Sequence, residues 1–441
     1  MKQNEEIKIS GLTSLGDGVG RHNGLTVFVP GALPGETVRI SPARLKKNYA
    51  RADLIEILES APERISPLCP VYNSCGGCCL QHLDYNEQLL HKQQWLADAL
   101  QRLGGLTLEV KPTIAAKAAT GYRNRVQLHA KWQGSQFKLG FYKQGSHELT
   151  EGGHCLLMRP ILAQLSALLG QLPPNMTGCL SGLRHIALRC DSLGESAMLV
   201  LVGVNGQAKH DELGKLAGWL MKQEARLVSI WTNTGRAIYG IYGEEWHKIA
   251  GQDKLFENCG DLCLHISAGA FTQINAAQAQ ILYGQVAFYA ALDGSQTVLD
   301  AYCGVGAIAL FLADKAQAVM GVEEYAPAVA DAQSNAILNG INNCRFIAGR
   351  VEGVLPLLAA QNSKIQVAVL DPPRSGCATA ALKALAKLKP RRIIYVSCDP
   401  ATLARDARLL KELGYIARIA QPLDMFPHTG HVEAIVLLQQ Q

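Results

Sequence analysis

The sequence predicts a three-domain α/β protein whose C-terminal domain is a doubly wound, mostly parallel sheet. Three observations favour this fold class. Residues 1–58 contain short strand-like runs separated by Gly and Pro, which is typical of a small all-β barrel. Residues 59–265 mix strand-like runs with helices, which indicates a mixed α+β domain. Residues 266–441 repeat a regular strand–helix alternation, which predicts a parallel sheet with helices on both faces.

The overall composition is that of a folded globular protein. Of 441 residues, 48% are hydrophobic and 18% are charged, and 42 basic residues face 37 acidic ones. This small basic excess is a weak indication of a polyanionic partner. The first ten residues, MKQNEEIKIS, lack the apolar core of a signal peptide, and no uncharged apolar run approaches the ~20 residues of a membrane helix. We therefore expect a cytoplasmic monomer with no membrane partner.

The first domain is expected to be a five-stranded barrel of the oligonucleotide-binding kind. The segment LTVFVPGALPGETVRI supplies strand-like runs with Gly and Pro turns, and DLIEILE ends the unit. Between Arg39 and Arg51 the chain has five basic residues, one tyrosine and no acid. Such a stretch could follow a phosphate backbone or could be a solvated hairpin, and the sequence leaves both possibilities open.

A cysteine-rich segment follows the barrel. The chain has thirteen cysteines, and without an export signal metal binding or catalysis is the better interpretation than disulfides. Cys69, Cys75 and Cys78, together with Cys155, supply four thiolates that suit either tetrahedral zinc or an iron–sulfur cluster. Cys79 adjoins Cys78 and is expected to point elsewhere. Apolar spacing then predicts a helix over 86–103, ended by two glycines, and a further helix over 207–223.

The C-terminal domain should contain seven strands. The link LDMFPHTGHVE is too short for a helical crossover, so the last two strands should be antiparallel. The strands are expected at QTVLDA, AVMGVE, CRFIAG, VAVLDPP, RIIYVSC, YIARIAQPL and EAIVLL.

A cofactor loop is expected after the first of these strands. In VLDAYCGVGAIALFLA, Gly304 and Gly306 permit a tight turn before a new helix, and Glu323 ends the next strand, where an acid can bind ribose hydroxyls. The loop lacks the third glycine of a dinucleotide fingerprint. This favours S-adenosylmethionine, with a nicotinamide cofactor or a purely structural loop as alternatives. Cys303 is expected to pack beneath the cofactor.

Two strand ends carry candidate chemistry beside this loop. Asp371 ends the fourth strand in LDPPRSG; amino-group methyltransferases have a similar acid-Pro-Pro-aromatic segment, and here Arg374 replaces the aromatic residue. Cys398 ends the fifth strand, where open α/β sheets bind ligands. The helix that starts at PATLARD is expected to lower the pKa of its thiol. A buried, inert cysteine is the alternative.

A thiol in this position suits methylation at carbon 5 of uracil. That carbon is a poor nucleophile until a thiolate adds to carbon 6, and a base must afterwards remove the carbon-5 proton. Glu433 begins the last strand beside the same edge and is the candidate base. His428 and His431 are alternatives for the base or for substrate orientation, although loop histidines often only form local hydrogen bonds.

Several motifs resemble one enzyme family along the whole chain. FTQIN, DAYCGVGAIAL, LDPPRSG, VSCDPATLARD and DMFPHTGHVEAIVLL, in this order, are similar to segments of the bacterial RNA uracil-C5 methyltransferases. GLTSLGDGVGRHNGLTVFVPGALPGETV resembles the TRAM barrel that part of the family carries. The resemblance implies a class I, Rossmann-like, S-adenosylmethionine-dependent methyltransferase domain, with Cys398 as nucleophile and Glu433 as base.

The resemblance also implies cofactor contacts and a metal centre. Asp399 stands where relatives usually carry Asn, and its charge is expected to raise the pKa of Cys398. Relatives with a TRAM barrel often hold a [4Fe–4S] cluster with this cysteine spacing, so the resemblance favours that cluster over zinc. The implied contacts to S-adenosylmethionine are Gln273, Tyr302, Glu323 and Asp371, with Ala307 and Arg350 contributing mainly backbone atoms.

The sequence as a whole therefore predicts an enzyme that methylates carbon 5 of a flipped-out uridine in 23S ribosomal RNA. The barrel and the cluster favour this substrate, because bacterial transfer-RNA enzymes of the family usually lack both. Arg123 and Arg125 are candidate RNA contacts. The alternatives are a tRNA uracil-C5 methyltransferase, an amino-group methyltransferase of nucleic acid, and a non-catalytic RNA-binding assembly factor.

Overall fold

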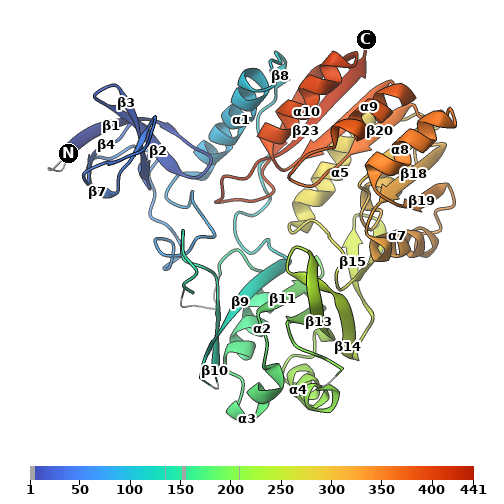
Figure 1. Cartoon of the computed structure of the whole chain (residues 1–441), viewed down its shortest axis with the longest axis horizontal. Coiled ribbons are helices and arrows are strands. Elements are labelled where there is room, and N and C mark those ends of the chain that lie inside the picture. Colours follow the sequence, from blue (N-terminus) through green and yellow to red (C-terminus); the bar gives the residue numbers. More distant parts are fainter. Residues whose placement is uncertain (1–4, 135, 151–154, 208) are drawn as a thin grey trace.

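A computed structural model describes residues 5–134, 136–150, 155–207 and 209–441, and it shows three lobes (Figure 1). The predicted order of an all-β domain, a mixed α+β region and an α/β domain is confirmed. Among the described residues, no helix is long and apolar enough to cross a membrane.

The N-terminal lobe is a curved sheet around a small apolar core that includes Ile9, Val29 and Ile40. Its strand order is β5-β6-β3-β2-β1-β4-β7. Five strands have four to eight residues each, as the sequence predicted, and the hairpin β5–β6 adds two strands of only two residues. The strands are β1 (Glu5–Leu12), β2 (Asp17–His22), β3 (Leu25–Pro30), β4 (Thr37–Ile40), β5 (Arg44–Leu45), β6 (Ala50–Arg51) and β7 (Leu54–Glu59).

The middle lobe has a six-stranded sheet in the order β10-β9-β11-β12-β13-β14. Buried side chains of its helices, such as Leu165 and Leu216, share one core with the sheet residue Ile186, as amphipathic helices on a sheet should. The elements are β9 (Arg125–Gln133), β10 (Gln136–Gly140), α2 (Pro160–Gly170), α3 (Pro174–Thr177), η1 (Gly178–Leu180), β11 (His185–Cys190), β12 (Ala197–Val202), α4 (His210–Gln223), β13 (Leu227–Tyr239) and β14 (Tyr242–Gly251). The hairpin β15 (Lys254–Cys259) and β16 (Leu262–Ser267) follows.

The C-terminal lobe is an eight-stranded sheet in the order β19-β18-β17-β20-β21-β23-β22-β8. All seven predicted strands are present. The last two pair antiparallel as expected, and β23 also lies antiparallel to β21 because it inserts between β21 and β22. The strands are β17 (Thr297–Ala301), β18 (Ala318–Glu323), β19 (Cys344–Ala348), β20 (Val367–Leu370), β21 (Arg392–Ser397), β22 (Tyr415–Leu423) and β23 (Glu433–Gln440).

Helices cover both faces of this sheet (Figure 1). One face packs against α5, α6 and α7, and the other packs against α8, α9 and α10, so the central strands are apolar on both sides. The helices are α5 (Ala276–Ala290), α6 (Ala307–Ala313), α7 (Ala326–Leu338), α8 (Val351–Ala360), α9 (Thr379–Leu388) and α10 (Pro400–Glu412).

Two elements from before the middle lobe complete the C-terminal one. The predicted helix is present as α1 (Tyr85–Arg102), capped by Asp84, and its buried Leu96 and Leu100 belong to the core that includes Leu403 of α10. Strand β8 (Glu109–Val110) pairs with β22 at the sheet edge. The C-terminal lobe is therefore discontinuous in sequence: α1 and β8 precede the middle lobe, and the segment from α5 onward follows it (Figure 1).

Candidate active site

The glycine loop follows β17 as predicted and turns sharply into α6. Gly306 caps α6 with φ of 86°, and a Cβ there would lie 3.0 Å from the Cβ of Ala332, so both conformation and space require glycine. Glu323 at the tip of β18 accepts hydrogen bonds from the backbone N–H of Gly304 at 3.1 Å and of Tyr325 at 2.8 Å. These bonds fix the carboxylate beside the loop, where a ribose could reach it.

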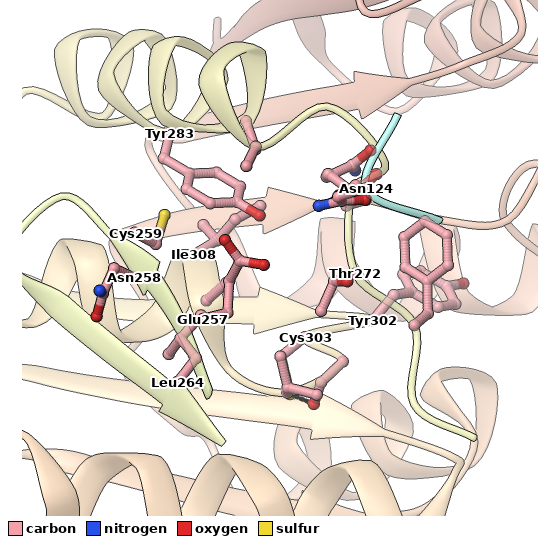
Figure 2. A pocket seen from close by; sticks show the side chains of 18 residues that line it. Asn124, Glu257, Asn258, Cys259, Leu264, Thr272, Tyr283, Tyr302, Cys303 and Ile308 are labelled. Atoms are coloured by element: carbon pink, nitrogen blue, oxygen red, sulfur yellow. Dashed lines mark hydrogen bonds between the residues drawn. The ribbon is translucent and has the colours of Figure 1, made fainter. Parts of the chain in front are cut away.

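A cavity opens over this loop (Figure 2). Of the predicted cofactor contacts, Gln273, Tyr302, Ala307 and Asp371 line it. Glu323 joins it through its bond to Gly304. The donor and acceptor groups and the glycine turn fit an amino-acid-bearing nucleoside such as S-adenosylmethionine.

Arg350 does not line this cavity. It precedes α8, and its exposed guanidinium forms an ion pair with Glu352 at 2.5 Å and approaches Glu324 at 3.8 Å.

Cys303 is buried and lines the cavity beneath the loop, where its sulfur occupies the space that a Cβ on Gly321 would take. That packing agrees with the structural role expected for this cysteine.

The sheet register brings Cys398 and Glu433 to the same edge. Ser397 pairs with Ala434 across β21 and β23, so the next position on each strand places Cys398 opposite Glu433. Glu433 is only 2% exposed, whereas Cys398 is half-buried and can be reached by a ligand. Asp371 directly follows β20, the parallel neighbour of β21.

The charges of Cys398, Glu433 and Asp371 affect one another's pKa values. Burial raises the pKa of Cys398 to about 11, with a further upward contribution from the Glu433 carboxylate. Burial likewise raises the pKa of Glu433 well above its usual range, and that of Asp371 to about 7. The expected lowering of the Cys398 pKa by the helix start is therefore wrong as a net effect, because desolvation of the thiolate dominates.

Arg374 opposes these upward shifts. Its guanidinium lowers the pKa of both Cys398 and Glu433, and it hydrogen-bonds the thiol. Its Nη2 also lies 3.5 Å from Nε2 of His431. The sequence showed this residue only as the replacement of an aromatic side chain. The structure places its guanidinium beside the Cys398 thiol.

Asp399 serves the helix that follows Cys398. Its carboxylate accepts hydrogen bonds from the N–H groups of Ala401 at 3.0 Å and Thr402 at 2.9 Å, and so caps α10. The main charges that raise the pKa of Cys398 are instead those of Glu433 and Asp371. The expected contribution of Asp399 is not among these main causes of the raised Cys398 pKa.

The loop before Glu433 is fixed by buried polar contacts. Lys92 of α1 donates to Asp424 at 2.5 Å, and both side chains are fully buried. Tyr85 also donates to Asp424, at 2.8 Å. The backbone of His428 is held by distant parts of the chain, because its N–H donates to the Gln88 side chain and its carbonyl accepts from the N–H groups of residues 79 and 80. The strand edge is thus tied to α1 and to the cysteine-rich segment.

The four predicted metal ligands meet at one cavity. Cys69, Cys75, Cys78 and Cys155 all line it, together with Arg123. Burial raises the pKa of Cys78 to about 12, while the Arg123 guanidinium lowers it. Within the described ranges, no three His, Cys, Asp or Glu side chains are arranged to hold a single metal ion.

Cys79 lies apart from these four thiols. Its sulfur is 4.0 Å from the carbonyl oxygen of Ser14, in a small core shared with the N-terminal lobe. Four thiols around one cavity are the type of ligand that iron–sulfur clusters and structural zinc sites use. The expected cluster stays a prediction.

The basic residues predicted to contact RNA are only partly free. Arg123 faces the cysteine cavity, and the Arg125 guanidinium lies 5.8 Å from the ring centre of Tyr242. In the N-terminal lobe, Arg39, Arg44 and Arg51 form ion pairs with acidic side chains of the same lobe. Lys46, Lys47 and Tyr49 remain exposed at the β5–β6 hairpin and offer cations and a ring to a nucleic acid.

Comparison with known proteins agrees with this arrangement. Residues 252–441 match the family described as tRNA (Uracil-5-)-methyltransferase, and residues 3–55 match the TRAM domain. The chain is 37% identical to an uncharacterized RNA methyltransferase of Halalkalibacterium halodurans, across 98% of this chain and 96% of that protein. It is 38% identical to one of Clostridium tetani, across 98% and 95%.

A solved structure matches the whole chain. The tRNA (uracil-54, C5)-methyltransferase of Pyrococcus abyssi, in complex with S-adenosyl-L-homocysteine, has a TM-score of 0.72 and 25% identity, and the match covers 99% of this chain and 100% of that one.

Proposed function

Because this chain belongs to the RNA uracil-C5 methyltransferase family, which uses S-adenosylmethionine, we propose that it methylates carbon 5 of one uridine in 23S ribosomal RNA through a covalent adduct with Cys398. The observation that supports the covalent mechanism is the placement of Cys398 opposite Glu433, with the charge of Asp371, a residue that lines the cofactor cavity, acting on both.

The cofactor, when bound, supplies an electrophilic methyl group. The Cys398 thiolate forms a bond to carbon 6 of the uracil ring, and the displaced electron pair makes carbon 5 nucleophilic. After carbon 5 has gained the methyl group, the Glu433 carboxylate accepts the carbon-5 proton. The electron pair of that C–H bond re-forms the ring double bond, and the S–C6 pair leaves with the sulfur, which restores the thiolate.

Arg374 has a defined part in this scheme. Burial raises the pKa values of both Cys398 and Glu433, yet both groups act as anions in this scheme. A guanidinium that lowers both pKa values makes the reactive forms more accessible near pH 7. We therefore assign Arg374 as a positioning residue, which acts through the charges of Cys398 and Glu433 and does not itself react. The buried site also requires that the uridine leave its stack to reach the thiol.

The substrate assignment has two candidates. The TRAM barrel together with the four-cysteine centre supports 23S ribosomal RNA. The match to a transfer-RNA enzyme over 99% of this chain supports a uridine of tRNA as the second candidate. We expect 5-methyluridine to disappear from one position of 23S RNA in a deletion strain and to return with the plasmid-borne gene. Loss from tRNA alone, measured by mass mapping of both RNAs, would reject the ribosomal substrate.

We further propose that Cys69, Cys75, Cys78 and Cys155 hold a [4Fe–4S] cluster, with zinc as the alternative. Anaerobically purified protein should contain about four iron and four sulfide per chain. Cys78→Ser should lose most of this iron, whereas the adjacent Cys79→Ser should keep it, because only Cys78 lines the cavity. Zinc without sulfide in the wild-type protein would contradict the assignment.

A further inference from the structure

The cofactor cavity contains an acid that the mechanism does not use. Glu257 of β15 lines the cavity and is 6% exposed, and its Oε1 has no hydrogen-bond partner. A buried carboxylate oxygen without a donor is costly. A buried carboxylate without a donor is rare in proteins unless a ligand binds to it. The position of Glu257 in the cavity wall therefore indicates that a ligand contacts it.

The surroundings of Glu257 do not neutralise it. Ser192 hydrogen-bonds the carboxylate and Arg189 lies near enough to attract it, but burial still raises its pKa to about 7. Arg189 itself donates to the carbonyl of Ala270 at 2.5 Å. Figure 2 shows the hydroxyl of Tyr283 and the carboxylate of Glu257 directed toward the same part of the cavity, so a second polar atom points at the same space.

The cavity as a whole suits a cation. Two acids, Glu257 and Asp371, line it, and no Lys or Arg occurs among its described lining residues. Asp371 belongs to the reacting end, since its charge acts on both Cys398 and Glu433. Figure 2 shows Glu257 and Tyr283 on one side of the cavity and Tyr302 on the other. The far side thus has an acidic side chain of its own.

S-adenosylmethionine carries a positive group at each of two places, the sulfonium and the α-ammonium of its amino-acid end. Its methyl-bearing sulfonium must lie toward Cys398 for transfer. The α-ammonium is then the cation left for the other acid. We propose that Glu257, together with the Tyr283 hydroxyl, binds the α-ammonium of the methionine moiety. This inference rests on the use of S-adenosylmethionine and is independent of the RNA target.

The test compares two ligands on full-length protein without RNA. Titration calorimetry should show that wild-type protein binds S-adenosylhomocysteine about 10- to 100-fold more tightly than its analogue without the α-amino group, the range expected for one charged hydrogen bond. Glu257→Gln should lose this preference by weakening only the amino-bearing ligand. Glu195→Gln removes an exposed carboxylate outside the cavity and should bind both ligands like wild type.

The outcomes separate clearly. Equal wild-type affinity for the two ligands would overturn the proposal, as would a Glu257→Gln variant that weakens both equally or neither. If that variant does not fold, the wild-type comparison still decides. A protein that discriminates the ligands as expected but methylates no uridine in 23S RNA would reject the substrate proposal and leave this one standing.

Discussion

Replacing Cys398 with alanine should abolish uridine methylation, with turnover falling by at least about 10⁴-fold. Without the sulfur no bond to carbon 6 can form, and carbon 5 stays too weak a nucleophile to accept a methyl group. The substitution leaves a small space at a half-buried position, so folding should be retained. Methyl transfer to RNA from labelled S-adenosylmethionine measures the loss, and thermal unfolding checks that the variant is folded.

The matched control is Cys303→Ala, which removes a thiol that lines the cofactor cavity. It should keep most of the activity, because that sulfur packs under the loop. RNA that contains 5-fluorouridine gives a second measurement. Wild type and Cys303→Ala should form an adduct that survives denaturing gels, since fluorine cannot be removed as a proton is. Methylation by Cys398→Ala would contradict the covalent mechanism.

Replacing Glu433 with glutamine should slow turnover by about 10²- to 10⁴-fold and should trap the enzyme on its product. The amide keeps the size of a side chain that is 2% exposed but cannot accept the carbon-5 proton. Cys398 can still add to the ring, so the methylated adduct should accumulate on ordinary RNA in the presence of S-adenosylmethionine. Denaturing gels with labelled RNA measure the trapped fraction.

Glu412→Gln provides the comparison for this second variant. Glu412 lies exposed at the end of α10, where it contacts Arg408, and its loss should leave turnover near the wild-type value. If Glu433→Gln turns over at a normal rate and forms no adduct, another group must remove the proton. His431 would then be the nearest candidate, since its side chain faces Arg374.

Local patterns were sufficient to predict the C-terminal sheet and the edge that holds the candidate site residues. Strands there are short, apolar and bounded by clear turns, and the carboxyl ends of neighbouring strands must meet. That rule alone brought Cys398, Asp371 and the glycine loop together. The position of Glu433 followed from the short link before it, which forces an antiparallel return.

Contacts between distant parts of the chain could not be predicted in this way. The pairing of Lys92 with Asp424 joins residues 332 positions apart, and neither local sequence indicates it. The same holds for Glu257, whose strand is unremarkable in sequence and whose carboxylate gains meaning only beside the cavity. The net rise in the pKa of Cys398 also depends on burial, which a linear pattern does not supply.

The placement of α1 and β8 has a consequence for biosynthesis. Helix α1 packs on α10, yet about 300 residues separate the two in the chain. At typical translation speeds the ribosome needs roughly 15 to 60 s to make that length. During this interval the apolar side of α1 lacks its final partner, α10.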